Sequence, residues 1–123
     1  MGSLIGVFDT NIVIDLLAGR RNAAQLYQSC DRTVISRIVW MEVLIGAAED
    51  DAEVRAFLRR NFEVYPIDET LADTAIELRR SYRLKLPDAL VWATALELSG
   101  VLYTRNTKDF NDSMARVAIP YHL

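Results

Sequence analysis

The chain has only one cysteine and one histidine among its 123 residues. Cys30 has no partner for an internal disulfide and no neighbouring Cys or His with which to form a zinc site. His122 stands next to the C-terminus, where we expect a surface side chain rather than a general base. No stretch approaches the roughly 20 apolar residues of a membrane span, and the apolar N-terminal region lacks the basic start of a signal peptide. We therefore expect a cytoplasmic protein with no membrane partner.

Acidic residues outnumber basic ones, which gives a net charge of −3. Overall charge thus argues against a nucleic-acid partner. However, all but two of the 14 basic residues are arginines, which suit bidentate recognition of phosphate. Four basic residues, Arg79, Arg80, Arg83 and Lys85, precede Asp88 closely and suggest a local phosphate contact. A solvated helix face would explain the same charges.

Short apolar segments alternate with amphipathic ones along the chain, which has the size and the 51% hydrophobic content of one soluble domain. This alternation predicts an α/β protein, a three-layer α/β/α sandwich with a mainly parallel sheet of four to five strands. The predicted strands are 4–8, 33–35, 62–65, 101–103 and 117–119. The predicted helices are 10–18, 22–30, 37–47 after an N-cap at Ser36, 51–60, 69–82 and 87–98.

Four isolated acids stand at positions suited to chemistry. Asp9 ends the first predicted strand, and Asp109 follows the polar stretch after the strand 101–103. Ligands of open α/β sheets bind outside the carboxyl ends of the strands, so these two acids are expected at one edge. Asp88 lies in the first turn of a predicted helix. Glu42 sits among large apolar residues of another helix, and burying a lone carboxylate there would be costly.

Each acid also has a simpler explanation. Asp9 is a suitable cap for the following helix, and Asp109 is a suitable turn residue. Asp88 in a first helical turn stabilises the helix by about 0.3–1 kcal/mol through the helix dipole. Glu42 would need no partner if its helix exposed one narrow polar stripe to water. These explanations are weaker taken together, because a parallel sheet would bring Asp9 and the segment 104–109 to the same edge.

Converging carboxylates need a cation to neutralise their repulsion. Oxygen ligands without His or Cys favour Mg²⁺ or Mn²⁺ over zinc. The chemistry that fits such a centre is metal-assisted phosphodiester hydrolysis. The residues therefore suggest a metal-dependent phosphodiesterase with an acidic site.

Four ordered motifs resemble the PIN-domain ribonucleases, in particular the VapC-type toxins of bacterial and archaeal toxin–antitoxin pairs. The motifs are Phe8-Asp9-Thr10-Asn11, Ser36…Glu42-x-x-x-Gly46, Leu86-Pro87-Asp88-Ala89 and the segment 102–110, Leu-Tyr-Thr-Arg-Asn-Thr-Lys-Asp-Phe. The resemblance spans nearly the whole chain and implies one PIN domain over residues 1–123. It also implies a cytoplasmic Mg²⁺-dependent endoribonuclease, with Mn²⁺ as a substitute, that cleaves tRNA, rRNA or mRNA. A cognate antitoxin and a homodimer are the implied protein partners.

The resemblance also assigns roles to individual residues. Asp9, Glu42 and Asp88 correspond to the core acidic site, with Asp9 and Asp88 as the metal ligands. Some family members have an acid at the position of Asn106 and others use the one that matches Asp109, so the fourth acidic position stays open between them. Asp109 is kept as a catalytic candidate. The expected substrate-positioning residues are Thr104, Asn106 and Asn11.

Two alternatives use the same residues differently. A HAD-type phosphatase also has an aspartate after its first strand, as a nucleophile. It would need a second aspartate where Asn11 stands, and a lysine in a role for which neither Lys85 nor Lys108 has a suitable context. The second alternative is a PIN-like module that binds RNA or protein without cleaving it.

Overall fold

Five strands form one parallel sheet in the order β3-β2-β1-β4-β5, with β1 in the centre. The structure is a computed structural model that describes residues 3–123. Every strand pairing is parallel, which confirms the predicted parallel sheet. The strands are β1 (Ile5–Phe8), β2 (Arg32–Ser36), β3 (Glu63–Tyr65), β4 (Val101–Tyr103) and β5 (Val117–Ala118).

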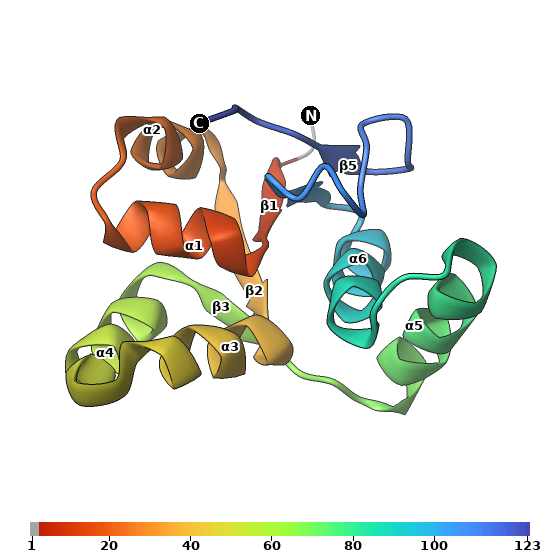
Figure 1. Ribbon diagram of the computed structural model, residues 1–123, viewed down its shortest axis with the longest axis horizontal. Coiled ribbons are helices and arrows are strands. Elements are labelled where there is room, and N and C mark those ends of the chain that lie inside the picture. Colours follow the sequence, from red (N-terminus) through yellow and green to blue (C-terminus); the bar gives the residue numbers. More distant parts are fainter. Residues whose placement is uncertain (1–2) are drawn as a thin grey trace.

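Helices pack on both sides of the strands, as Figure 1 shows, with α1 and α2 on one side and α5 and α6 on the other. This arrangement confirms the predicted α/β sandwich. Within residues 3–123, no helix is long and apolar enough to cross a membrane. The helices are α1 (Thr10–Leu17), α2 (Arg21–Ser29), α3 (Arg37–Ala47), α4 (Asp51–Asn61), α5 (Glu69–Tyr82) and α6 (Leu86–Leu98), with a short 3₁₀ turn, η1 (Ala48–Asp50), before α4.

Local signals explain where most elements begin and end. The Ser36 hydroxyl accepts the backbone N–H of Ile38 at 3.2 Å and so caps α3, as predicted. Gly19 follows α1 with a φ of 76°, a conformation that favours glycine. The strand predicted from Phe62 begins one residue later, because the Phe62 N–H still bonds to the Leu58 carbonyl at the end of α4. The last predicted strand ends at Ala118, one residue early.

Helix α6 is the centre of the core. All its residues from 89 to 95 are buried, and it packs against β1, β2 and β4. Trp92, 1% exposed, contacts the rings of Tyr82 and Phe110 edge to face, and its indole N–H bonds to the Ala115 carbonyl. Because residues 89–95 of α6 are packed in the core, the core also fixes the position of the first turn of this helix, which carries Asp88.

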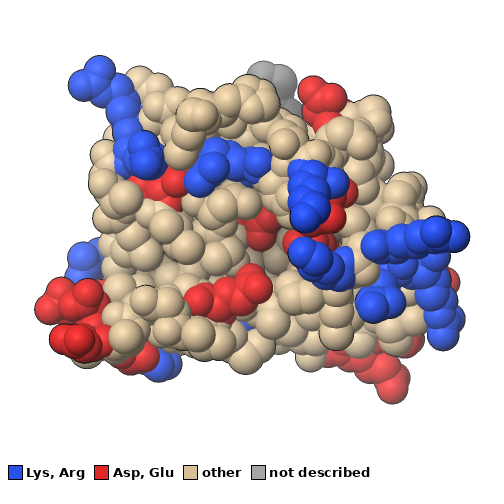
Figure 2. Space-filling view, viewed as in Figure 1, with Lys and Arg blue, Asp and Glu red and all other residues tan. Residues whose placement is uncertain are grey.

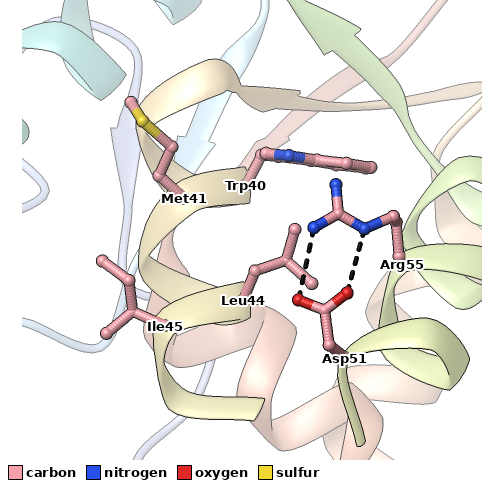
Figure 3. Close-up of a pocket in the computed structure, with 6 residues that line it drawn as sticks. All are labelled: Trp40, Met41, Leu44, Ile45, Asp51 and Arg55. Atoms are coloured by element: carbon pink, nitrogen blue, oxygen red, sulfur yellow. Dashed lines mark hydrogen bonds and ion pairs between the residues drawn. The ribbon is translucent and has the colours of Figure 1, made fainter. Parts of the chain in front are cut away.

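A shallow apolar pocket of about 390 Å³ lies between α3 and α4 (Figure 3). We call it the α3–α4 pocket; it is lined by Trp40, Met41, Leu44, Ile45, Asp51 and Arg55. The Arg55 guanidinium stacks 5.4 Å from the Trp40 ring centre and makes two hydrogen bonds to Asp51. Met41 and Ile45 are 41% and 81% exposed. The pocket thus offers apolar surface to a partner.

We predict that two glycine-to-alanine substitutions act in opposite directions. A Cβ at Gly100 would lie 2.8 Å from the Ile5 carbonyl oxygen, so Gly100→Ala should destabilise the protein by about 1–3 kcal/mol. A Cβ at Gly46 in α3 would meet nothing within 4 Å, so Gly46→Ala should stabilise it by about 0.5–1 kcal/mol. Urea unfolding of both variants measures the difference. Equal effects would contradict the close approach of Gly100 to β1.

Candidate active site

The pairing of β1 with β4 brings Asp9 next to Thr104. Phe8 and Tyr103 are register partners, so the residues that follow them leave the sheet side by side. The Asp9 N–H donates to the Tyr103 carbonyl at 3.0 Å, and the Thr104 hydroxyl donates to the Asp9 carboxylate at 2.8 Å. Asp9 is only 7% exposed, and Thr104 is fully buried. The adjacent strand ends predicted from the sequence are therefore observed.

Asp9 also caps α1, which was its simpler explanation. One carboxylate oxygen accepts the Thr10 N–H at 2.8 Å. The other accepts the Thr104 hydroxyl and, at the longer distance of 3.5 Å, the Asn11 amide. These hydrogen bonds fix the orientation of the Asp9 carboxylate. Asp9 can therefore cap α1 and also serve as a functional residue.

Glu42 faces this site from α3. It is half-buried, and its carboxylate accepts the Thr10 hydroxyl at 2.6 Å. The helix thus directs Glu42 to a partner rather than simply to water. The sequence prediction did not assign Thr10 a role, although it lies between Asp9 and Asn11. A hydroxyl beside an isolated acid was the signal that could have identified it.

Asp88 completes the acidic group from the first turn of α6, where the helix dipole favours an acid. Partial burial, with the nearby charges of Asp9, Asp109 and Glu42, raises the pKa of Asp88 from 3.8 to about 6, and Lys85 opposes this. The charges of the other three predicted acids therefore all act on Asp88.

Asn106 and Asp109 form a pair in the segment that follows β4. The Asn106 amide donates to the Asp109 carboxylate at 2.9 Å, and the Asp109 N–H donates back to the Asn106 side-chain oxygen at 3.2 Å. The Asn106 N–H also bonds to the Thr104 hydroxyl. Asp109 is thus a turn residue, as its simpler explanation held. Asn106 and Asp109, the two residues considered for the fourth acidic position, are therefore hydrogen-bonded to each other.

Lys85 lies near this cluster, whereas the other predicted basic residues, Arg79, Arg80 and Arg83, and the histidine lie outside it. Lys85 lowers the pKa of the nearby Asp88 carboxyl. The three arginines of the predicted basic group are exposed near the C-terminal end of α5, and His122 is exposed. Figure 2 shows acidic atoms at the centre of the face where the strand ends meet, with basic side chains around them.

Lys85 lies near Asp88, but across residues 3–123 the four acids of the cluster form no direct ion pair with a Lys or Arg. Burial, with the charge of Glu42, raises the pKa of Asp9 against the lowering effect of its hydrogen bonds. In the same residues, no three acidic, His or Cys side chains are close enough to share one ion. Two carboxylates with waters satisfy Mg²⁺, so Asp9 and Asp88 suit that ion as a donor set.

Known proteins share this fold. The family model described as PIN domain matches residues 6–117. A chain of a toxin–antitoxin complex from Klebsiella pneumoniae is 41% identical over 96% of this chain and 99% of that chain, with a TM-score of 0.88. A chain of VapBC-1 from nontypeable Haemophilus influenzae is 25% identical, with coverages of 87% and 90% and a TM-score of 0.71.

A third similar structure, a chain of FitAcB from Neisseria gonorrhoeae, is 23% identical over 96% of this chain and 99% of that chain. Its TM-score of 0.77 supports the fold alone. No curated protein sequence matches the chain. The chain belongs to the PIN-domain family, and its predicted similarity to the VapC type is confirmed. The HAD-type phosphatase has no support from these matches.

We predict that the metal-free protein gains stability as the pH falls from about 7.5 to about 5. The raised pKa of Asp88, about 6 against 3.8, means that the folded state holds this proton more tightly than the unfolded state. The resulting stability is fully present below about pH 4 and is lost as the pH rises through about 6. Asp88→Asn should therefore stabilise the protein at about pH 7.5 by about 1–2 kcal/mol, a value reduced for partial exposure.

Unfolding in EDTA over this pH range, for the wild type and Asp88→Asn, measures the effect. The exposed Asp112, changed to Asn, serves as a matched control and should leave the pH profile unchanged. A wild-type profile that rises with pH between about 5 and 7, and that Asp88→Asn does not alter, would contradict the electrostatic account.

Proposed function

We propose that this protein is a Mg²⁺-dependent endoribonuclease that acts as the toxin of a toxin–antitoxin pair. The observation that carries the proposal is the acidic cluster at the carboxyl edge of the sheet, whose acids form no direct ion pair within residues 3–123. Asp9 ends β1 there, and the charge of Glu42 acts on it. The charges of Asp9, Glu42 and Asp109 all act on Asp88. Membership of the PIN-domain family supports the nuclease class.

In the proposed mechanism, Asp9 and Asp88 hold the cation, and Mn²⁺ substitutes for Mg²⁺. When bound, the cation would neutralise the charge that develops on the phosphodiester oxygens. Glu42 accepts the proton of the attacking water, and the hydrogen bond from Thr10 orients its carboxylate. Thr104 holds the Asp9 carboxylate in plane.

The substrate-side residues follow from the same geometry. Asn11 and Asn106 are partly exposed at the edge of the cluster and have amide groups suited to water or phosphate. Thr104 is fully buried and positions substrate indirectly, through its hydrogen bond to Asp9. Asp109 acts through its pairing with Asn106. Lys85, beside Asp88, is the cation best placed to contact an RNA backbone, and the exposed arginines of α5 extend that charge.

We expect the protein, freed of any antitoxin, to cleave RNA in Mg²⁺ or Mn²⁺ and to stop in EDTA. Asp9→Asn and Asp88→Asn should each reduce cleavage by about 100-fold or more, because losing a ligand costs at least as much as losing a residue that supports one. Asparagine can still cap α1, so Asp9→Asn should fold. Electrophoresis of total tRNA, rRNA and mRNA after incubation measures cleavage.

Asp112→Asn makes the same chemical change at an exposed position and should cleave like the wild type. Cleavage that persists in EDTA or in both active-site variants would overturn the metal-nuclease proposal. RNA binding without cleavage by the wild type would instead support the inert PIN-like module.

We further propose that an antitoxin covers the α3–α4 pocket. Support comes from its exposed apolar residues, Met41 and Ile45, and from the similarity to a chain of a toxin–antitoxin complex. From family resemblance we also propose a homodimer.

The expected result is that Ile45→Glu weakens antitoxin binding by about 10-fold or more, because it places a charge against an apolar partner surface. Ile76→Glu makes the same change at an exposed position of α5 and should leave binding unchanged. Calorimetric titration with the cognate antitoxin measures affinity. If Ile45→Glu instead converts a dimer into a monomer and leaves antitoxin binding intact, the pocket belongs to a second copy of the chain.

A further inference from the structure

A buried ion-pair network joins α1 to the segment that follows β4. Asp15 of α1 is 3% exposed and accepts two hydrogen bonds from the Arg105 guanidinium, at 2.6 and 3.0 Å. The Tyr121 hydroxyl, near the C-terminus, donates to the same carboxylate at 2.7 Å. Arg20 adds a longer ion pair at 3.6 Å. The proposed mechanism uses none of these side chains.

The network holds Arg105 in one orientation. Burial alone would raise the pKa of Asp15, but the hydrogen bonds and charge of Arg105, with the Tyr121 hydroxyl and Arg20, outweigh it and lower the pKa. A charged carboxylate at this depth needs its donors, and removing one leaves buried charge poorly compensated. The two parallel hydrogen bonds also fix the plane of the guanidinium.

The backbone of Arg105 connects this network to Asp9. Its N–H donates to the Asn11 side-chain oxygen at 3.0 Å, which turns the Asn11 amide nitrogen towards the Thr104 hydroxyl at 3.3 Å. Thr104 in turn donates to the Asp9 carboxylate. A continuous series of contacts therefore runs from Asp15 to Asp9.

The same residue influences the second half of the segment. Arg105 lies between Thr104 and Asn106, and the Asn106 N–H bonds to the Thr104 hydroxyl at 3.0 Å. The Asn106 side chain then holds Asp109. A shift of the Arg105 backbone would thus displace the contacts of two of the four acids.

We propose that Arg105, anchored by Asp15 and Tyr121, is a positioning residue that sets the orientation of the Asp9 carboxylate and of the segment carrying Asp109. The inference rests on the proposed nuclease function. A direct role in binding RNA phosphate is disfavoured, because two guanidinium nitrogens are already bonded to Asp15. The Arg105 side chain is 28% exposed, so the experiment includes that role as an outcome.

Matched variants separate positioning from stability. Arg105→Lys and Tyr121→Phe weaken the network. Arg32→Lys alters a two-bond pair with Glu63 at the start of β2, which is more exposed than the pair of Arg105 with Asp15. Tyr27→Phe removes a hydroxyl that bonds to Asn61. For each protein we would measure kcat and KM for RNA cleavage, the Mg²⁺ dissociation constant by calorimetry, and Tm.

Arg105→Lys should lower kcat and weaken Mg²⁺ binding by about 10- to 100-fold, the usual range for residues that support metal ligands. KM for RNA should stay within about twofold of wild type. Tyr121→Phe should act in the same direction and less strongly, and it preserves the test if Arg105→Lys does not fold. The two control variants should keep wild-type kcat and Mg²⁺ affinity.

Two results would overturn the inference. Wild-type kcat and Mg²⁺ affinity with a lowered Tm would make the network merely structural, and a raised KM with wild-type kcat would make Arg105 an RNA contact. Failure of the proposed function has a different signature, because the wild-type protein itself would then leave RNA intact. In that event the Mg²⁺ affinities alone decide whether Arg105 positions Asp9.

Discussion

The candidate site depends on one pairing, that of β1 with β4 at the centre of the parallel sheet. Because Phe8 and Tyr103 are register partners, Asp9 and Thr104 leave the sheet at the same level and bond to each other. The first helix and the segment 104–109 both start from this point. A change of register by one residue would turn Thr104 to the opposite face and separate the two halves of the site.

Asp9 and Asp15 are both buried, but their surroundings shift the pKa values of their carboxyls in opposite directions. Asp15 is compensated by Arg105 and Arg20, and its pKa is lowered. Asp9 receives only neutral hydrogen-bond donors, and its pKa is raised. One carboxylate thus has its cations within the protein, whereas the other is left with an attraction for a cation from solution.

The sequence predicted the elements and the four acids because these depend on local patterns. The helix 69–82 and the strand 101–103 were placed at their observed bounds, and Glu42 was selected because a carboxylate in an apolar helix needs a partner. The same argument applies to Asp15, which the prediction passed over. Its partners could not have been named, since Arg105 and Tyr121 are 90 and 106 residues away and only the fold brings them near. The two hydrogen bonds between Asn106 and Asp109 likewise became evident only in the structure.

The burial of residues 89–95 of α6 has a consequence for motion. A helix with seven successive core residues opens only when the whole domain unfolds, so its amide hydrogens should exchange as slowly as any in the molecule. Asp88 therefore belongs to the helix that should resist local unfolding most strongly. The segment 104–109 lies outside regular helix and strand and is held instead by side-chain hydrogen bonds, from Arg105 to Asp15 and from Asn106 to Asp109. The two sides of the site are thus held differently, so the loss of one polar contact would loosen the segment 104–109 and leave Asp88 in place.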